Sequence, residues 1–342
     1  MCNRTSAKQS AEPLPELSET GPDAEDIVMT ETQETDTVQI VMPTAPGSCR
    51  PVVPQHNGPC RVMGILNVTP DSFSDGGRYE ATDAAIAHGL RMAAAGADFV
   101  DVGGESTRPG ATRVSAVEER RRILPVITEL ARQGVAVSVD TTRAAVADIA
   151  LGAGAVLVND VSGGLADRHM ARVVANAGAP WVLTHWRAHS RDMDGAATYR
   201  DVVNEVRNAL LARIDHALTA GVAADRIIVD PGFGFAKRPP HDIALLARLD
   251  AITDLGFPVL IGTSRKRFLN TLLSADGHTP RSPSERDSAT LATTVHAAQA
   301  GAWAVRVHDV APNVDVLRVV AAVTKAAQQQ KVSFAGSPAT TV

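Results

Sequence analysis

Short apolar runs recur along the chain, and a polar side chain stands at the end of each run. Seven of the runs follow a glycine, and these glycines are Gly96, Gly134, Gly154, Gly178, Gly221, Gly256 and Gly301. The polar ends lie near Asp101, Asp140, Asn159, His185, Asp230, Ser264 and the pair Arg306 and His308, while one earlier run, RVMGIL, ends at Asn67. A glycine that ends a helix, followed by a buried strand, makes one βα unit. The pattern therefore predicts eight strands with helices between them.

Eight such units predict an α/β fold, a (β/α)8 TIM barrel with its functional side chains at one end. The apolar runs are rich in branched residues, as in DFVDV, AVLVND and PWVLTH, which is typical of parallel strands buried on both faces. An open doubly wound sheet is the alternative. It is disfavoured because polar residues end all eight runs, whereas an open sheet binds ligands only at its switch point.

The segments between the apolar runs carry helical spacing. TDAAIAHGLRMAAAG and VVNEVRNALLARIDHALTAG both place apolar residues at helical intervals and end in glycine. Ser115 and Glu118 have the spacing of a capping box, which predicts that a helix begins there. Pro125 falls inside the same helical segment, and we expect it to kink or interrupt the helix.

Three regions of the chain differ in composition. Residues 1–58 are rich in Glu, Asp, Thr, Ser and Pro, and we expect them to form a disordered acidic extension. Residues 59–328 hold the apolar runs and are expected to form the barrel as a single domain, followed by a flexible tail over residues 329–342. With 342 residues, 44% of them hydrophobic, the chain is long enough to bury the core of such a barrel.

Composition also limits the partners and the compartment. A net charge of −5 argues against nucleic acid as a partner, and no stretch has the roughly 20 apolar residues of a membrane span. The cysteines Cys2, Cys49 and Cys60 form neither a CxxC pair nor a disulfide framework. No secretory signal is apparent at the N-terminus. We therefore expect a cytoplasmic protein that acts on small molecules.

The polar strand ends would converge on one rim of the barrel and concentrate more charge there than helix capping requires. These residues are Asp101, Glu105, Asp140, Asn159, Asp230, Lys266, Arg306 and His308. The carboxylate, amide and ammonium groups of Asp140, Asn159, Asp230 and Lys266 could recognise a flat heterocycle. A second, cationic or neutral-polar group suits an oxyanion such as phosphate. Its members are Asn67, Thr107, Arg108, Arg265, Arg306 and His308.

Seven motifs along the chain resemble those of the dihydropteroate synthases. In chain order they are NVTPDSFSDGG from Asn67, DVGGESTRPGA from Asp101, VSVDTTR ending at Arg143, VNDVSGG containing Asn159, DPGFGFAK from Asp230, GTSRKRF from Gly262 and VRVHDV from Val305. The resemblance covers residues 61–325. The segment HWRAHS after the fifth predicted strand looks most like actinobacterial members of the family.

The resemblance implies a transferase of folate biosynthesis that joins 7,8-dihydropterin-6-ylmethyl diphosphate to 4-aminobenzoate, and it also implies a homodimer. It assigns pterin binding to Asp140, Asn159, Thr184, Asp230, Phe235 and Lys266. The resemblance assigns diphosphate binding to Asn67, Thr107, Arg108, Arg306 and His308, and Mg2+ binding to Asn67. The 4-aminobenzoate site comprises Phe73, Thr107, Pro109, Ser264, Arg265 and Lys266. Catalysis is assigned to Asp75, Asp140, Lys266, Arg306 and His308.

One position departs from the family pattern. The residue before the histidine that follows the fifth strand is usually methionine, packing on the pterin face, whereas this sequence has Thr184. A catalytically weak or inactive pterin-binding paralogue is therefore one alternative. A corrinoid-type pterin methyltransferase is another, although it has no use for a diphosphate site. Zinc at His185 and His189 is disfavoured because no third ligand at suitable spacing accompanies them.

Overall fold

The computed structural model describes residues 58–69, 78–105, 113–187, 195–274, 279 and 281–335. Eight strands run through this part of the chain, each ending within three residues of a polar side chain named above. They are β1 (Arg61–Asn67), β2 (Phe99–Gly103), β3 (Val137–Asp140), β4 (Leu157–Asp160), β5 (Trp181–Thr184), β6 (Ile227–Asp230), β7 (Leu260–Ile261) and β8 (Ala304–Val307).

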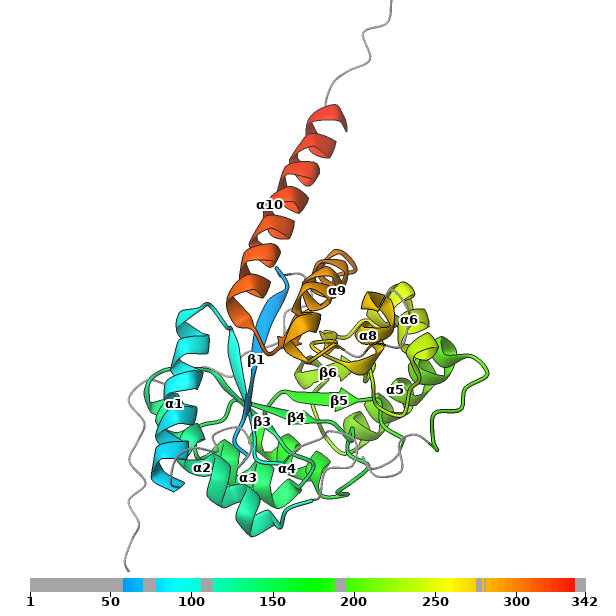
Figure 1. Ribbon diagram of the computed structural model, residues 1–342. Coiled ribbons are helices and arrows are strands. Elements are labelled where there is room, and N and C mark those ends of the chain that lie inside the picture. Colours follow the sequence, from blue (N-terminus) through cyan, green and yellow to red (C-terminus); the bar gives the residue numbers. More distant parts are fainter. Residues whose placement is uncertain are drawn as a thin grey trace, which may run out of the picture. The chain divides into compact units, whose positions relative to one another are not determined.

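Helices connect the strands throughout the described ranges. They are α1 (Arg78–Ala94), α2 (Ala116–Arg132), α3 (Ala144–Gly152), α4 (Met170–Ala177), α5 (Val202–Thr219), α6 (Pro239–Ala247), α7 (Asp250–Thr253), α8 (Arg267–Leu273), α9 (Asp287–Gln299) and α10 (Val310–Ala335), with short 3-10 turns at Ala224–Arg226 and Ser284–Arg286. Helices α1 to α5 follow one another around the outside of the strands (Figure 1).

The strands pair in the order β6-β5-β4-β3-β2-β1-β8-β7, and every pairing is parallel. A parallel bridge between Val229 and Val259 joins β6 to the residue just before β7. The backbone N–H of Val229 donates to the Pro258 carbonyl at 2.9 Å on the same edge. This contact brings the two ends of the sheet together, and the predicted barrel is confirmed.

The glycines that introduce the strands all have a left-handed backbone. From Gly96 to Gly301 their φ angles lie between 61° and 107°. An L-residue rarely adopts this conformation, because its Cβ comes too close to a neighbouring carbonyl. The glycine therefore permits the chain to leave a helix sharply and enter the next strand.

Helix α2 begins as predicted but is not interrupted. The Ser115 hydroxyl accepts the backbone N–H of Glu118 at 3.1 Å, which caps the helix, while the Glu118 carboxylate pairs with Arg121 instead of returning to the cap. The helix continues through Pro125 to Arg132. Proline removes one backbone hydrogen bond, but burial of the apolar face of α2 offsets that loss.

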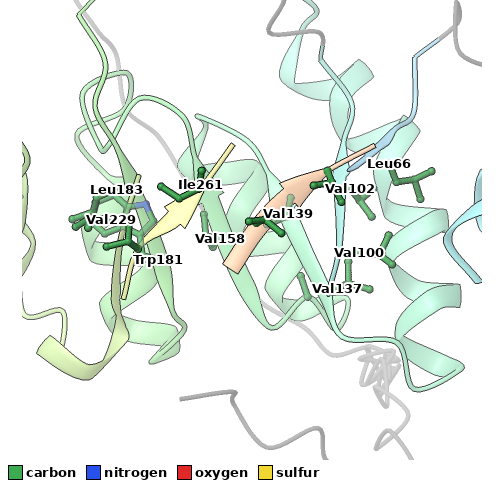
Figure 2. Close-up of a cluster of buried hydrophobic side chains, with 14 of the residues drawn as sticks. Leu66, Val100, Val102, Val137, Val139, Val158, Trp181, Leu183, Val229 and Ile261 are labelled. Carbon is green, nitrogen blue, oxygen red and sulfur yellow. The ribbon is translucent and has the colours of Figure 1, made fainter. Parts of the chain in front are cut away.

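Alternate side chains of each strand face two separate cores. Outward-facing residues such as Val100, Val139 and Leu183 pack beneath the helices, as Figure 2 shows. Inward-facing residues form a smaller core inside the barrel. They are Met63, Phe99, Leu157, Val182, Ile228, Leu260, Trp303 and Ala304. The centres of the Phe99 and Trp303 rings in this core lie 5.6 Å apart.

The inner core determines where polar side chains can point. Because side chains alternate along a strand, the residue two positions beyond each inner-core residue also faces inward. In this way Phe99 is followed by Asp101, Leu157 by Asn159, and Ile228 by Asp230. Val182 is likewise followed by Thr184, and Ala304 by Arg306. A polar layer thus lies directly above the apolar one, at the carboxyl ends of the strands.

Residues 1–57 of the predicted acidic extension and residues 336–342 of the predicted tail lie outside the described residues. Their boundaries near residues 58 and 328 stay predictions, and α10 runs on to Ala335. Within the described ranges, no helix combines the length and apolar character needed to cross a bilayer.

A pair of glycine substitutions should separate backbone strain from steric conflict. In Gly134→Ala the new methyl group meets no atom within 4 Å, so we expect a loss of about 1–2 kcal/mol from the left-handed φ alone. In Gly154→Ala it lies 2.7 Å from the Ala131 Cβ, so the loss should exceed that of Gly134→Ala by about 1 kcal/mol or more. Urea unfolding followed by circular dichroism measures both. Equal losses would contradict this account.

Candidate active site

A cavity of about 660 Å3 opens at the carboxyl ends of the strands. β1, β4, β6 and β8 contribute to its wall, and the turns after β6 and β7, together with α6 and α8, supply most of the rest. Nine of the predicted site residues line it: Asn67, Asn159, Asp230, Phe235, Ser264, Arg265, Lys266, Arg306 and His308. The structure therefore brings together residues from both ends of the barrel sequence.

Two further predicted residues lie in the polar layer beside this cavity. Asp140 is buried and contacts Arg306. Thr184 is only 1% exposed, and its hydroxyl has no hydrogen-bond partner among the described residues. The remaining predicted residues fall outside the described ranges, and these are Phe73, Asp75, Thr107, Arg108 and Pro109.

Arg306 joins carboxylates from two other strands. Its Nε donates to Asp101 Oδ2 at 2.6 Å, and its Nη2 donates to Asp140 Oδ2 at 2.7 Å. Asn159 Nδ2 donates to the same Asp101 oxygen at 2.8 Å. One oxygen of Asp101 therefore orients both a guanidinium and an amide that face the cavity. All four residues lie in strands, so rigid elements hold this arrangement.

The two carboxylates share a single compensating cation. Burial raises the pKa of Asp140 to about 7. The positive charge of Arg306 opposes this rise in pKa, and the negative charge of Asp101 adds to it. Asp140 can therefore hold or release a proton near neutral pH. When ionised, it can accept two parallel hydrogen bonds from a ligand with an amidine-like edge.

The turn after β6 positions a second acid beside a lysine. Asp230 Oδ1 accepts the backbone N–H of Gly232 at 2.7 Å, and burial raises the pKa of the Asp230 carboxyl. Lys266 Nζ donates to the Phe233 carbonyl and lies 4.5 Å from the centre of the Phe235 ring. Burial lowers the pKa of Lys266 to about 8, although nearby Asp230 opposes the change. The ammonium is thus ready to donate to a ligand oxygen or nitrogen.

The loop after β7 holds two predicted residues in different ways. Ser264 Oγ lies 3.0 Å from His308 Nδ1 and accepts the His308 backbone N–H at 3.2 Å, which fixes the histidine at the rim. Arg265 has a left-handed φ of 59°, and its guanidinium makes two 2.7 Å hydrogen bonds to Asp287. Arg265 therefore lines the cavity with a guanidinium that is already paired.

The sequence predicts that Asp101 lies at the rim, but the motifs assign no role to this residue. Lys237 is not among the predicted site residues. Lys237 lines the cavity at the end of the DPGFGFAK motif. A lysine closing a glycine-rich turn after a buried strand is the signal that could have drawn attention to it. Glu105 lies apart from the cavity lining and pairs with Arg113 and Arg143.

The candidate metal ligands named in the sequence differ in their surroundings. Among the described residues, no group of three His, Cys, Asp or Glu side chains could hold a metal ion. Mg2+ needs no such group, because it is usually bound by one or two protein oxygens together with substrate phosphates. The Asn67 amide oxygen fits this requirement, in the same cavity as Arg306 and His308. His185 Nδ1 lies 3.0 Å from Lys237 Nζ, an arrangement that does not favour zinc.

Comparison with known proteins agrees with the resemblance seen in the sequence. Residues 63–308 match the family described as pterin binding enzyme. The dihydropteroate synthase of Mycobacterium leprae is 55% identical over 265 residues, which cover 77% of this chain and 93% of the relative. The organism is actinobacterial, as the sequence predicted.

Two solved structures of the Xanthomonas albilineans dihydropteroate synthase have the same fold. The one with 4-aminobenzoic acid matches with a TM-score of 0.72 and 47% identity, covering 78% of this chain and 93% of that one. The complex with 7,8-dihydropteroate matches with a TM-score of 0.70 and 43% identity, covering 79% and 95%.

We expect Asp140→Asn to stabilise the folded protein in a pH-dependent way. The folded Asp140 keeps its proton up to about pH 7, whereas an unfolded aspartate ionises near pH 3.8. Ionisation therefore favours the unfolded state of the native chain as pH rises between these values. Urea unfolding should give the variant an advantage of about 1 kcal/mol or more at pH 8 and almost none near pH 4. A pH-independent difference would contradict the burial of Asp140 as an acid that Arg306 compensates only in part.

Proposed function

The chain belongs to the dihydropteroate synthases, within the family of pterin-binding enzymes, and we propose that it condenses 7,8-dihydropterin-6-ylmethyl diphosphate with 4-aminobenzoate. The products are 7,8-dihydropteroate and diphosphate. The observation that carries the proposal is the polar layer of Asp140, Asn159, Asp230, Lys266 and Arg306 at one cavity. The family's solved complexes with 4-aminobenzoic acid and 7,8-dihydropteroate support it.

The pterin is assigned to the middle strands. Its flat ring has an amidine-like N–H edge, which the carboxylates of Asp140 and Asp230 suit, while the Asn159 amide can both donate and accept. Lys266 donates to a ring oxygen or nitrogen. Phe235, stacked near the Lys266 ammonium, supplies an apolar wall. This set offers a hydrogen-bond partner for each polar edge of the ring.

The diphosphate is assigned to the first and last strands. Asn67, Arg306 and His308 line the cavity where it would bind, and the sequence adds Thr107 and Arg108 from the segment after β2. Mg2+ held by Asn67 and the diphosphate would offset charge on the leaving group. Because Ser264 and Asp101 already orient His308 and Arg306, these cationic and donor groups need little rearrangement when the diphosphate binds.

The reaction is expected to be dissociative. The C–O bond to diphosphate breaks first, and its electron pair leaves with the diphosphate. The positive charge left on the methylene carbon is shared with the electron-rich pterin ring and is offset by the Asp140 carboxylate, and the family resemblance adds Asp75 to this role. The nitrogen of 4-aminobenzoate then forms the C–N bond and releases a proton. Because an arylamine is unprotonated at neutral pH, the attack needs no strong general base.

The 4-aminobenzoate is assigned to the side of the cavity formed by the loop after β7. Ser264 and Lys266 offer donors there, while Arg265 supports the wall through its pair with Asp287. Phe73, Thr107 and Pro109 complete the predicted pocket from segments outside the described residues.

A catalytically weak pterin-binding paralogue is the second candidate. The observation that favours it is the buried hydroxyl of Thr184, which lacks a partner among the described residues where the family usually has methionine. The intact charged layer argues for the active enzyme, since a protein that only bound pterin would not need Arg306 and His308. The cytoplasmic location also stays a prediction.

We further expect a homodimer that pairs through α9 and α10. Val319 and Val323 on α10 are 63% and 64% exposed, and their spacing of four places them on one helix face. They border a groove of about 410 Å3 that Val295, Val316 and Val320 also line. A contiguous exposed apolar surface of this kind is typical of an interface between subunits.

The activity is tested by measuring diphosphate release from the pterin substrate. We expect rapid release when 4-aminobenzoate is present, with 7,8-dihydropteroate formed in equal amount. Asp140→Asn should lower turnover by about 100-fold or more, because the ring loses its ionised acceptor. Asp148→Asn, an exposed position on α3, is the matched control and should be unaffected. Pterin binding without any diphosphate release would favour the inactive paralogue.

Charged substitutions on α10 test the dimer. The double variant Val319→Glu, Val323→Glu places four like charges across a two-fold interface and should sediment as a monomer, while the native chain sediments as a dimer. Leu211→Glu, at an exposed leucine on α5, should stay dimeric. A native chain that is monomeric at micromolar concentration would refute the homodimer.

A further inference from the structure

Lys237 is a charged residue enclosed where the proposed chemistry gives it no task. It is 7% exposed, close to the cavity, and lies at the end of the turn between β6 and α6. Burying an ammonium is costly unless hydrogen bonds replace its water. The groups that contact the Lys237 ammonium should therefore indicate the role of this residue.

Three acceptors surround the ammonium of Lys237. Nζ donates to the Gly232 carbonyl at 2.8 Å and to the Phe235 carbonyl at 3.2 Å. His185 Nδ1, just beyond β5, lies 3.0 Å away. Burial, with the positive charge of Lys237, lowers the pKa of His185 to about 2, so the ring is neutral and can accept. Three acceptors match the three protons that an ammonium donates.

The turn around Lys237 has a demanding backbone. Gly232, Gly234 and Ala236 all have left-handed φ angles, of 69°, 72° and 46°. Such a conformation is unfavourable for alanine, so other contacts must hold it in place. The Tyr199 hydroxyl donates to the Ala236 carbonyl at 3.1 Å, and Asp242 accepts the Gly234 N–H at 2.7 Å. Lys237 alone among these contacts binds two carbonyls inside the turn.

The same turn carries three of the groups that shape the cavity. The Gly232 N–H fixes the Asp230 carboxylate, the Phe233 carbonyl accepts Lys266 Nζ, and the Phe235 ring faces that ammonium. Gly232 also lies against β5, because a Cβ there would be 2.3 Å from the His185 carbonyl oxygen. A shift of the turn would therefore move Asp230 and Lys266 together.

We propose that Lys237 is a positioning residue for pterin binding: its ammonium holds the 231–236 turn against His185, so that Asp230 and Lys266 meet the ring in the correct geometry. The inference rests on the proposed function, since it assigns Lys237 a part in the same site. In this role Lys237 acts through Asp230 and Lys266, and it has no part in binding the diphosphate or 4-aminobenzoate.

Two substitutions test this role by steady-state kinetics. Lys237→Met keeps most of the volume but removes all three donors, and it should raise the KM for the pterin diphosphate about tenfold. Lys237→Gln retains two N–H donors and should raise it about threefold. The KM for 4-aminobenzoate should change less than about twofold in both, because only the pterin side of the site is displaced. Lys325→Met, the same change at an exposed lysine on α10, is the matched control and should leave both KM values near native.

The experiment distinguishes a failure of this inference from a variant that does not fold and from a failure of the proposed function. Circular dichroism and the midpoint of thermal unfolding confirm that each variant is folded. Should Lys237→Met not fold, the Gln variant decides alone, and a native pterin KM there overturns the inference. Equal rises in both KM values, or an equal effect of Lys325→Met, would also overturn it. If the native chain releases no diphosphate, the proposed function fails, and calorimetric titration with 6-hydroxymethyl-7,8-dihydropterin tests Lys237 in its place.

Discussion

The pairing of Arg306 with Asp101 and Asp140 is the contact around which the polar layer is organised. Two carboxylates and one guanidinium occupy the barrel interior, where an unpaired charge would cost several kcal/mol. Both acids depend on Arg306, because removing it would leave two buried acids without a cation. The apolar inner core below supplies no alternative partner. The closed barrel is therefore what keeps these three residues within hydrogen-bond distance.

Much of the fold could be predicted because its signals are local. A left-handed glycine, an apolar run and a polar end occupy adjacent positions, so the repeat is visible without any knowledge of the neighbours. The inward direction of Asp140, Asn159 and Asp230 follows from the alternation of side chains once the strands are accepted. The family motifs then added roles that spacing alone could not supply.

Contacts between segments that are far apart in the chain could not be predicted from the sequence. The pairing of Arg265 with Asp287 depends on how α9 packs beside the β7 loop, and local spacing contains no trace of it. The continuity of α2 through Pro125 has the same origin, because the packing of its buried face decides the outcome. The contacts of Lys237 could not be predicted either. Its partners are backbone carbonyls, which every residue carries, and a histidine, and no sequence motif links a lysine to such partners.

The position of Arg306 on the last strand also bears on how the protein is made. Arg306 follows Asp101 by 205 residues and Asp140 by 166. A chain emerging from the ribosome therefore presents both acids long before the cation that pairs with them exists. The first strands cannot bury their carboxyl ends in ionised form at that stage, and β1 still lacks β8 as its neighbour. Completion of the site and closure of the barrel thus become one late event in biosynthesis, which depends on the arrival of β8.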